Sequence, residues 1–161
     1  MIRSKRVGVV VFMAAIALAV AGCGGAYGGG SSPAKANSGT ASVDVANSNL
    51  GKILVDGSGR TLYLFEADKG TSSKCDGACA SVWPPLTSKG ISPSAGAGVA
   101  AAKLGTAKRG DGTVGVTYNG HPLYTYAGDT APGQATGQGS DDFGAEWYVL
   151  SAAGKAIESG E

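Results

Sequence analysis

The stretch Thr61-Leu62-Tyr63-Leu64-Phe65-Glu66-Ala67-Asp68 recurs 61 residues later as Pro122-Leu123-Tyr124-Thr125-Tyr126-Ala127-Gly128-Asp129. Both copies follow the pattern Tyr-x-aromatic-x-x-Asp. Further along, Trp83 matches Trp147 at an offset of 64 residues, so both tryptophans of the chain fall on equivalent positions. The extra three residues indicate an insertion within residues 132–140. A repeat at this period predicts that one structural unit occurs twice.

Each copy of the repeat carries the signals of a β-hairpin. In the first copy, residues 52–56 and 61–65 flank Gly57-Ser58-Gly59. The apolar run from Leu62 to Phe65 predicts a strand that is covered on both faces.

In the second copy, residues 114–118 and 122–126 flank Asn119-Gly120, the dipeptide favoured by type I′ hairpin turns. We interpret Leu50-Gly51 and Leu104-Gly105 as equivalent openings of the two hairpins.

These patterns predict one all-β domain with little helix. We expect either a small antiparallel sandwich or an open barrel, made of two repeats related by a pseudo-two-fold axis. The first β repeat is expected at residues 42–90, a connection at 91–103 and the second β repeat at 104–158. A short helical turn is expected at residues 76–82, with Asp76 as its cap.

Residues 1–22 are typical of a lipoprotein signal peptide. Arg3, Lys5 and Arg6 precede about 15 uncharged, mostly apolar residues, fewer than the roughly 20 that a membrane-spanning helix needs. The sequence Val20-Ala21-Gly22-Cys23 resembles a bacterial lipobox, in which the cysteine receives a diacylglyceryl group and acyl chains such as palmitate. The alternative is ordinary cleavage after Ala21. We predict attachment to the cell membrane through lipid on Cys23, on the extracytoplasmic face.

Residues 23–41 are rich in glycine, serine and alanine and carry too little apolar bulk for a core, so we expect a flexible linker. Three of the 13 basic residues lie in the signal, which leaves 10 basic and 12 acidic residues behind it. With this charge and no basic block, the sequence argues against nucleic-acid binding.

The remaining cysteines, Cys75 and Cys79, form an even pair outside the cytoplasm, where a disulfide is the default. An exposed redox pair and a soft metal site with His121 are the alternatives. Zinc would require more ligands than these three residues supply. With one histidine and no Gly-x-Ser-x-Gly, the chain offers no catalytic triad. We predict no catalytic residue and no cofactor.

At these motifs the chain resembles a bacterial lipoprotein family that carries a "secreted repeat of unknown function". The likeness rests on both copies of Tyr-x-aromatic-x-x-Asp and on the stretches at residues 75–86, 118–124 and 137–148. It covers about residues 50–154. The resemblance implies tandem repeats and an extracytoplasmic location, and it implies no established reaction.

The motif residues have a structural interpretation and two functional ones. Structurally, Tyr63 with Phe65 and Tyr124 with Tyr126 each share one strand face and pack there, as we expect also for Trp83 and Trp147. The aspartates that follow, Asp68 and Asp129, then accept local backbone N–H groups at the strand ends.

In the first functional alternative, the two aspartates face each other across the pseudo-two-fold axis and bind calcium. In the second, the aromatic residues form a polar-rimmed surface for a protein or glycan. His121 is expected as a solvated turn residue, with a metal or haem ligand as the alternative.

These observations favour a lipid-anchored, non-enzymatic binding or interaction module at the cell envelope, with an unknown envelope ligand or protein as its partner. The first alternative is an extracytoplasmic redox or metal-handling protein that uses Cys75 and Cys79. The second is a calcium-binding repeat domain.

Overall fold

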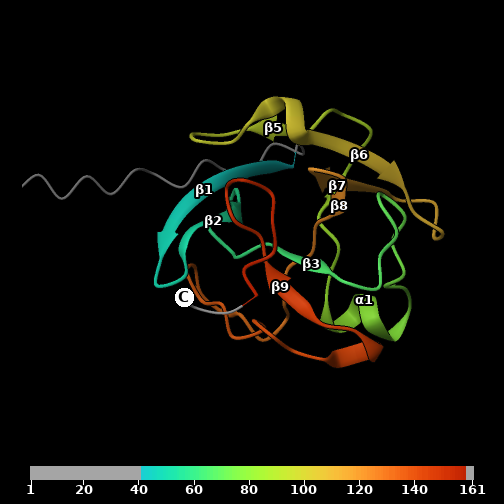
Figure 1. The fold of residues 1–161 in the computed structure, drawn as a ribbon. Helices are drawn as coiled ribbons and strands as arrows, with labels where there is room; N and C mark the ends of the chain where they lie inside the picture. The colour runs from blue at the N-terminus through green and yellow to red at the C-terminus, as the bar shows by residue number, and fades with distance from the viewer. Residues whose placement is uncertain (1–40, 159–161) are drawn as a thin grey trace, which may run out of the picture. The chain divides into compact units, whose positions relative to one another are not determined.

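Short strands and turns alternate along residues 41–158, the part of the chain that the computed structural model describes (Figure 1). The expected signal peptide and Cys23 lie outside the described residues. The elements in chain order are β1 (Ser42–Ser48), β2 (Gly51–Asp56), β3 (Tyr63–Phe65), α1 (Ala78–Val82), β4 (Thr87–Ser88), β5 (Ser94–Ala95), η1 (Ala101–Lys103), β6 (Leu104–Lys108), β7 (Val114–Tyr118), β8 (His121–Pro122), η2 (Asp142–Gly144) and β9 (Trp147–Val149).

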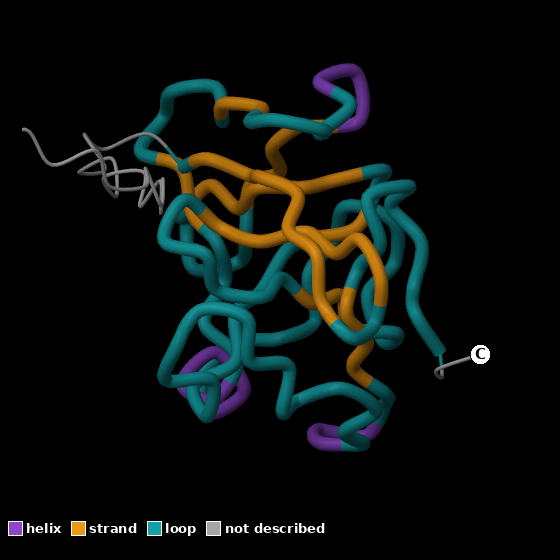
Figure 2. The backbone as a smooth tube through the Cα atoms, turned by 90° about the vertical axis from the view of Figure 1, so that its left-hand side faces the viewer, coloured by secondary structure: helices purple, strands orange, loops and turns teal. Residues whose placement is uncertain are grey.

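The strands form small sheets that are mostly antiparallel. β1 and β2 form a hairpin, and β5 adds to the other edge of β1 in parallel. β7 lies between β4 and β6 and also pairs with β8. β3 pairs with β9. Seen from the side, the short helical segments lie at the periphery and long loops fill much of the remaining volume (Figure 2).

The last strand of each half pairs with the other half. β3 in the first half is antiparallel to β9 in the second, with Tyr63 opposite Val149. The counterpart of β3, residues 122–126, pairs in the same way with residues 84–86 of the first half. There Thr125 N donates to Pro84 O at 2.9 Å. Each half is therefore completed by a segment of the other.

We call the segment that each half contributes to the other its exchanged segment. A closed ring of backbone hydrogen bonds joins each exchanged segment to the hairpin of the half that receives it. In the first ring, Leu54 N donates to Leu150 O (2.9 Å), Leu150 N to Leu62 O (3.1 Å), and Leu62 N to Leu54 O (3.0 Å). The second ring repeats this arrangement at the equivalent positions Val116, Leu86 and Leu123. In both rings the exchanged leucine satisfies backbone groups that would otherwise be buried without a partner.

A pseudo-two-fold axis passes between Tyr63 and Tyr124. The N–H of each residue donates to the carbonyl oxygen of the other, at 2.8 and 3.0 Å, which is the reciprocal pair of an antiparallel ladder. The two tyrosines occupy equivalent repeat positions, so the strand exchange is symmetrical about them. The prediction of an all-β antiparallel fold from two related repeats is confirmed. No sheet within residues 41–158 closes into a barrel, which favours the sandwich.

The core has an aromatic side and an aliphatic side, with β3 between them. Tyr63 and Phe65 belong to the aromatic cluster, whereas Leu62 and Leu64 belong to the aliphatic one. All four side chains are at most 3% exposed. Since successive residues of a strand point to opposite faces, the apolar run predicted this two-sided burial correctly.

The predicted hairpins are present, and the turn at Asn119-Gly120 has the expected geometry. Both residues have positive φ, 51° and 87°, as a type I′ turn requires. In the first half, Asp56 N donates to Arg60 O at 2.8 Å across the predicted glycine-rich turn.

Two local expectations are wrong. Leu50 and Gly51 lie at the turn between β1 and β2, whereas Leu104 and Gly105 open β6, the counterpart of β1. A Leu-Gly pair alone does not fix the position of a turn.

Asp76 does not cap the helical turn, which begins at Ala78 after Gly77 and has no side-chain cap. Its carboxylate instead lies 3.2 Å from the guanidinium of the buried Arg109. This charge-assisted hydrogen bond occupies the carboxylate that a cap would need. No helix among the described residues has the length and hydropathy needed to cross a membrane.

Candidate functional site

The repeated motif forms a pair of hydrogen bonds between the two halves of the domain. The hydroxyl of Tyr63 donates to Asp129 Oδ2 at 2.6 Å, and the hydroxyl of Tyr124 donates to Asp68 Oδ2 at 2.8 Å. Each tyrosine therefore binds the aspartate of the other half. We call this pair of interactions, made by Tyr63, Asp68, Tyr124 and Asp129, the clasp.

The spacing within the motif follows from the turn that ends each strand. Asp68 N donates to Phe65 O at 3.0 Å, and Asp129 N donates to Tyr126 O at 3.1 Å. This turn of aromatic-x-x-Asp reverses the chain and leaves the carboxylate beside the tyrosine of the other half. The pattern Tyr-x-aromatic-x-x-Asp thus encodes both a strand end and a contact across the axis.

Local backbone groups hold the second oxygen of each carboxylate. Asp68 Oδ1 accepts from Lys74 N at 2.7 Å, and Asp129 Oδ1 accepts from Thr136 N at 2.9 Å and from its hydroxyl at 2.6 Å. Each carboxylate thus accepts a backbone N–H, but from a residue six or seven positions further along the chain and not from the Asx-type turn that the structural interpretation expected. The cross-axis tyrosines were not part of that prediction.

A column of stacked aromatic rings lies beside the clasp. Trp83 and Trp147 stack at the centre, with ring centroids 4.0 Å apart and planes inclined by 4°. Phe65 stacks on Trp147 at 4.1 Å, and Tyr126 lies on the other side of Trp83 at 4.5 Å. Every ring in this column comes from the repeated positions, so the equivalent tryptophans meet face to face between the two halves.

The clasp tyrosines close the sides of this column. Tyr63 meets Trp83 edge to face at 5.2 Å, and Tyr124 meets Trp147 in the same way at 5.1 Å. Such contacts add about 0.5–1.5 kcal/mol each beyond the burial of the ring area. The rings and the clasp form one connected cross-half interface.

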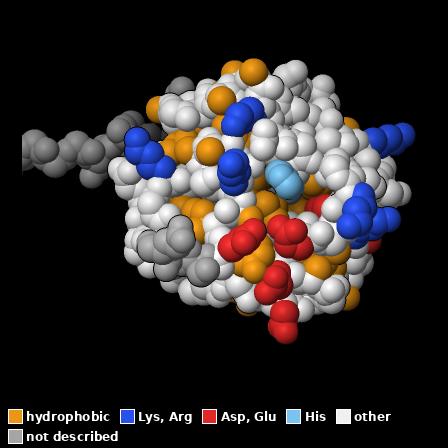
Figure 3. Space-filling model, viewed as in Figure 1, with side chains coloured by type: hydrophobic (Ala, Val, Ile, Leu, Met, Phe, Trp, Pro, Cys, Tyr) orange, Lys and Arg blue, Asp and Glu red, His pale blue; other side chains and the backbone are white. Residues whose placement is uncertain are grey.

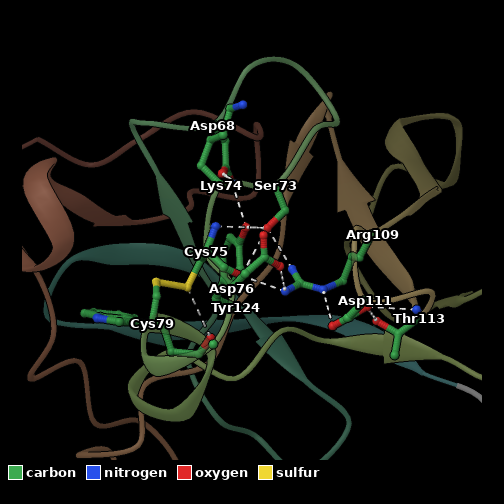
Figure 4. A network of polar contacts seen from close by, with 12 residues as sticks. Asp68, Ser73, Lys74, Cys75, Asp76, Cys79, Arg109, Asp111, Thr113 and Tyr124 are labelled. Atoms are coloured by element: carbon green, nitrogen blue, oxygen red, sulfur yellow. Dashed lines mark hydrogen bonds and ion pairs between the residues drawn. A yellow bond between two sulfur atoms is a disulfide. The ribbon is translucent and has the colours of Figure 1, made fainter.

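The two ends of the clasp differ in their surroundings. At the Asp68 end, the Tyr124 hydroxyl also lies 2.8 Å from Ser73 Oγ, which accepts from Arg109 Nη1 at 2.7 Å (Figure 4). Arg109 Nη2 donates to Cys75 O at 2.6 Å. Arg109 is 6% exposed, and its charge is balanced by Asp76 and Asp111. This arginine ties the cysteine loop to the β6–β7 hairpin.

Burial shifts the acid–base behaviour of these groups. It raises the pKa of both clasp tyrosines well above 10.0, and the neighbouring carboxylates raise each further. Burial also raises the pKa of Asp68 above 3.8, although the Lys74 N–H, the Tyr124 hydroxyl and the positive charge of Arg109 oppose that shift. The tyrosines therefore remain neutral hydrogen-bond donors throughout the physiological pH range.

The predicted disulfide between Cys75 and Cys79 is confirmed. Both cysteines are buried, at 0% and 6% exposure, and Cys75 Sγ lies against Trp83 O. Because the sulfurs are bonded to each other, they offer no thiolates for a soft metal site with His121. His121 itself is half-buried at the hairpin turn and near enough to Asp68 to lower the pKa of that carboxyl.

The structure does not bring Asp68 and Asp129 into a shared cation site. They have no hydrogen-bond partner in common, and each carboxylate binds a different tyrosine. Within residues 41–158, no group of three histidine, cysteine or acidic side chains is arranged to hold a metal ion.

Sequence reasoning missed Arg109 and Ser73. Their roles depend on contacts 36 residues apart in the chain, and neither residue belongs to the repeat motif. One weak signal was present, since Asp111 follows Arg109 by two residues at the hairpin turn and is a potential partner for its charge.

Removing one clasp hydroxyl should destabilise the domain measurably. We expect Tyr63→Phe to lower the free energy of unfolding by about 1–3 kcal/mol, because it leaves the buried Asp129 Oδ2 without its donor while Thr136 still holds Oδ1. In a double-mutant cycle with Asp129→Asn, the two changes should be non-additive. Urea denaturation followed by near-ultraviolet circular dichroism measures both. Tyr126→Phe is the control, since that hydroxyl makes no hydrogen bond within the described residues. Equal losses in both Phe variants would contradict the clasp.

The clasp also predicts a loss of stability in alkali. Above about pH 10 the unfolded chain releases its tyrosine protons, whereas folded Tyr63 and Tyr124 keep theirs. The folded state then binds more protons, so stability present below this pH decreases as the pH rises toward the raised folded values. The Tyr63→Phe/Tyr124→Phe double variant should show a smaller decrease over the same range. A parallel decrease in both proteins would show that other groups cause the alkaline unfolding.

One family model matches the chain, the one described as "secreted repeat of unknown function", at residues 44–87 and 105–151. These two matches coincide with the two structural halves that the clasp joins. No curated protein and no solved structure shows significant similarity to the chain. The protein belongs to the family of secreted repeats of unknown function and contains two tandem copies of the repeat.

Proposed function

We propose that the protein is a lipid-anchored, extracytoplasmic module that binds a partner at the cell envelope and catalyses no reaction itself. The observation that carries this proposal is that the polar groups of the clasp are already used within the domain. Tyr63, Tyr124 and Asp129 are at most 3% exposed, and their hydroxyl and carboxylate oxygens are hydrogen-bonded across the clasp. Side chains held in this way keep the halves together and are not presented to a substrate.

The anchor is supported by the sequence before the domain. A basic start, a short apolar stretch and small residues before Cys23 are the features that lipid attachment requires. One acyl chain gives only marginal membrane binding, whereas two or more hold a protein stably. A lipidated Cys23 with several acyl chains would keep the domain at the membrane surface.

Binding is supported by how the surfaces of the two halves differ. Around β3 and β9, Glu66 and Glu146 are exposed and Tyr148 is half-buried, and a hydrogen bond to Glu146 raises the pKa of Tyr148. The equivalent positions in the other half are Ala127, Val82 and Pro84. Acidic side chains gather beside hydrophobic ones on one face of the domain (Figure 3). The halves share a core but present different surfaces.

Large apolar side chains at the surface also favour an interaction role. Ile91 is 56% exposed and Phe143 is 48% exposed. Phe143 also has a φ of 62°, a left-handed conformation that is costly for a bulky residue. Such strain is typical of positions where presentation of a side chain matters more than stability.

The redox and calcium alternatives receive less support. Both cysteines of the disulfide are buried, whereas a redox-active pair has to be accessible to its partner thiols. The two motif aspartates are separately bound by tyrosines, which leaves no paired carboxylates for calcium.

Mass spectrometry of the mature N-terminus tests the anchor. We expect a chain that starts at Cys23 and carries a diacylglyceryl group with additional acyl mass. Cys23→Ser should abolish the modification and move the protein from the detergent phase to the aqueous phase, because lipid transfer needs the thiol. Ser31→Ala is a matched control and should remain in the detergent phase. A lipid-free chain that starts at Gly22 would disprove the anchor.

Photo-crosslinking in intact cells tests the interaction. Benzoylphenylalanine placed singly at Phe143, Ile91 and Thr106 samples three exposed surfaces of the domain. We expect a light-dependent adduct of constant mass from at least one position, and no adduct from the same variants kept in the dark. Absence of adducts from all three would contradict an interaction role.

A further inference from the structure

The outer edge of β6 has free backbone groups. In the β6–β7 ladder, Arg109 N donates to Thr113 O and Asn119 N donates to Lys103 O. Pairing alternates along an antiparallel ladder, so Gly105 and Ala107 also bond to β7, whereas Thr106 and Lys108 point their N–H and C=O groups away from it. Within residues 41–158, no backbone group bonds to this side of Thr106 or Lys108. Both residues are exposed.

The equivalent edge in the first half is occupied. β5 and the residues after it run parallel to β1, where Ser94 N donates to Ala41 O (2.9 Å), Gly96 N donates to Val43 O (2.7 Å), and Val45 N donates to Ala97 O (3.3 Å). At the repeat offset of 61, Val43 and Val45 of β1 correspond to Leu104 and Thr106 of β6, whereas Ala41 corresponds to Ala102 in η1. The bonding positions of β1 therefore correspond to those on the free edge of β6.

The second half uses its own final residues in another way. After Leu150 the chain turns back on itself, with Ser151 N donating to Lys155 O at 2.9 Å. Ile157 N then donates to Val149 O at 3.0 Å, and Gln138 donates to the Ile157 carbonyl. Residues 151–157 therefore follow β9, whereas the corresponding segment of the first half crosses to β1.

A pocket of about 240 Å³ lies beside the free edge. It touches Leu104, Gly105 and Thr106 in succession, which indicates contact with the strand edge because consecutive side chains point to opposite faces. The rest of its lining is small and uncharged, and it consists of Ser92, Pro93, Ala95 and Ala101. The space suits an extended backbone with small side chains.

We propose that the free edge of β6 binds an extended segment of another polypeptide as an added parallel strand. The interaction of β5 with β1 is its internal template, and the inference rests on the proposed function as a binding module. The bound segment has small, uncharged residues next to Leu104 and Thr106. A carboxylate toward its C-terminal end would face Lys108. Backbone pairing provides the affinity in this mode of recognition, and the flanking pocket provides the selectivity.

The free edge lacks most of the usual protection against strand addition. Exposed edges are commonly guarded by proline, by bulges or by several charged side chains. β6 contains no proline, and its ladder with β7 runs without a bulge; its one charged residue is Lys108 at the end. The edge of this five-residue strand is therefore open to an added strand.

A peptide titration tests the proposal directly. The probe is an acetylated peptide with the sequence of residues 92–99, which contains the β5 template, added to the ¹⁵N-labelled chain without its signal. We expect saturable shifts of the Thr106 and Lys108 amide signals and slower hydrogen exchange at both. The same peptide with Gly96→Pro lacks the N–H that donates to Val43 in the template, and we expect no binding from it.

Protein variants provide a matched pair. Thr106→Pro removes only an outward N–H, so the rest of the amide spectrum should be preserved while peptide binding is lost. Thr106→Val keeps the N–H and should bind as the parent does. Because the two peptides are compared on the unaltered protein, the test does not depend on the folding of Thr106→Pro.

Several outcomes would overturn the inference. They are the absence of shifts at millimolar peptide, shifts confined to other surfaces, and equal binding of the Gly96→Pro peptide. Concentration-dependent shifts at Thr106 without peptide, with a doubled mass in sedimentation, would instead assign the edge to a second copy of this chain. Crosslinks from Phe143 or Ile91, without a crosslink or peptide-dependent shifts at Thr106, would overturn this inference alone. The proposed function would then still hold.

Discussion

The reciprocal hydrogen bonds between the backbones of Tyr63 and Tyr124 constrain the rest of the structure. They place two equivalent strands antiparallel across an axis, so whatever follows each strand in one half must lie against the other half. The exchanged segments then bring Trp83 and Trp147 together at the centre, and the strand-end turns bring each aspartate to the opposite tyrosine. The stacked column and the clasp are consequences of this single pairing.

Much of the fold could be predicted from sequence because its signals are local or repeated. The duplicated motif, the Asn119-Gly120 turn and the Cys75–Cys79 disulfide each depend on neighbouring residues or on internal matching. Strand exchange could not be predicted from the sequence. Two similar halves show the same hydrophobic pattern whether each keeps its last strand or donates it to the other half. β1 was missed since it directly follows linker-like sequence, and Arg109 was missed because its partners are distant in the chain.

The two halves have equivalent residues where they pack against each other and different residues in their outer loops. Beside Asp129 the loop offers Thr136 and Gly137, and a side chain on Gly137 would collide with the Trp83 ring. Beside Asp68 the corresponding loop carries Ser73, the disulfide and the buried Arg109. The duplicated interior thus supports unlike peripheries, so one repeat sequence can build a shared core and still leave different side chains exposed on each half.

The central claim is that each half lacks a strand that only the other half supplies. It is tested most directly by producing residues 41–98 and 99–158 as separate chains and recording near-ultraviolet circular dichroism and amide dispersion for each. The account predicts that neither fragment alone has the aromatic signal of the stacked tryptophans or a cooperative unfolding transition, since each has lost its exchanged strand. A single fragment that folds cooperatively with native-like aromatic signals would contradict it.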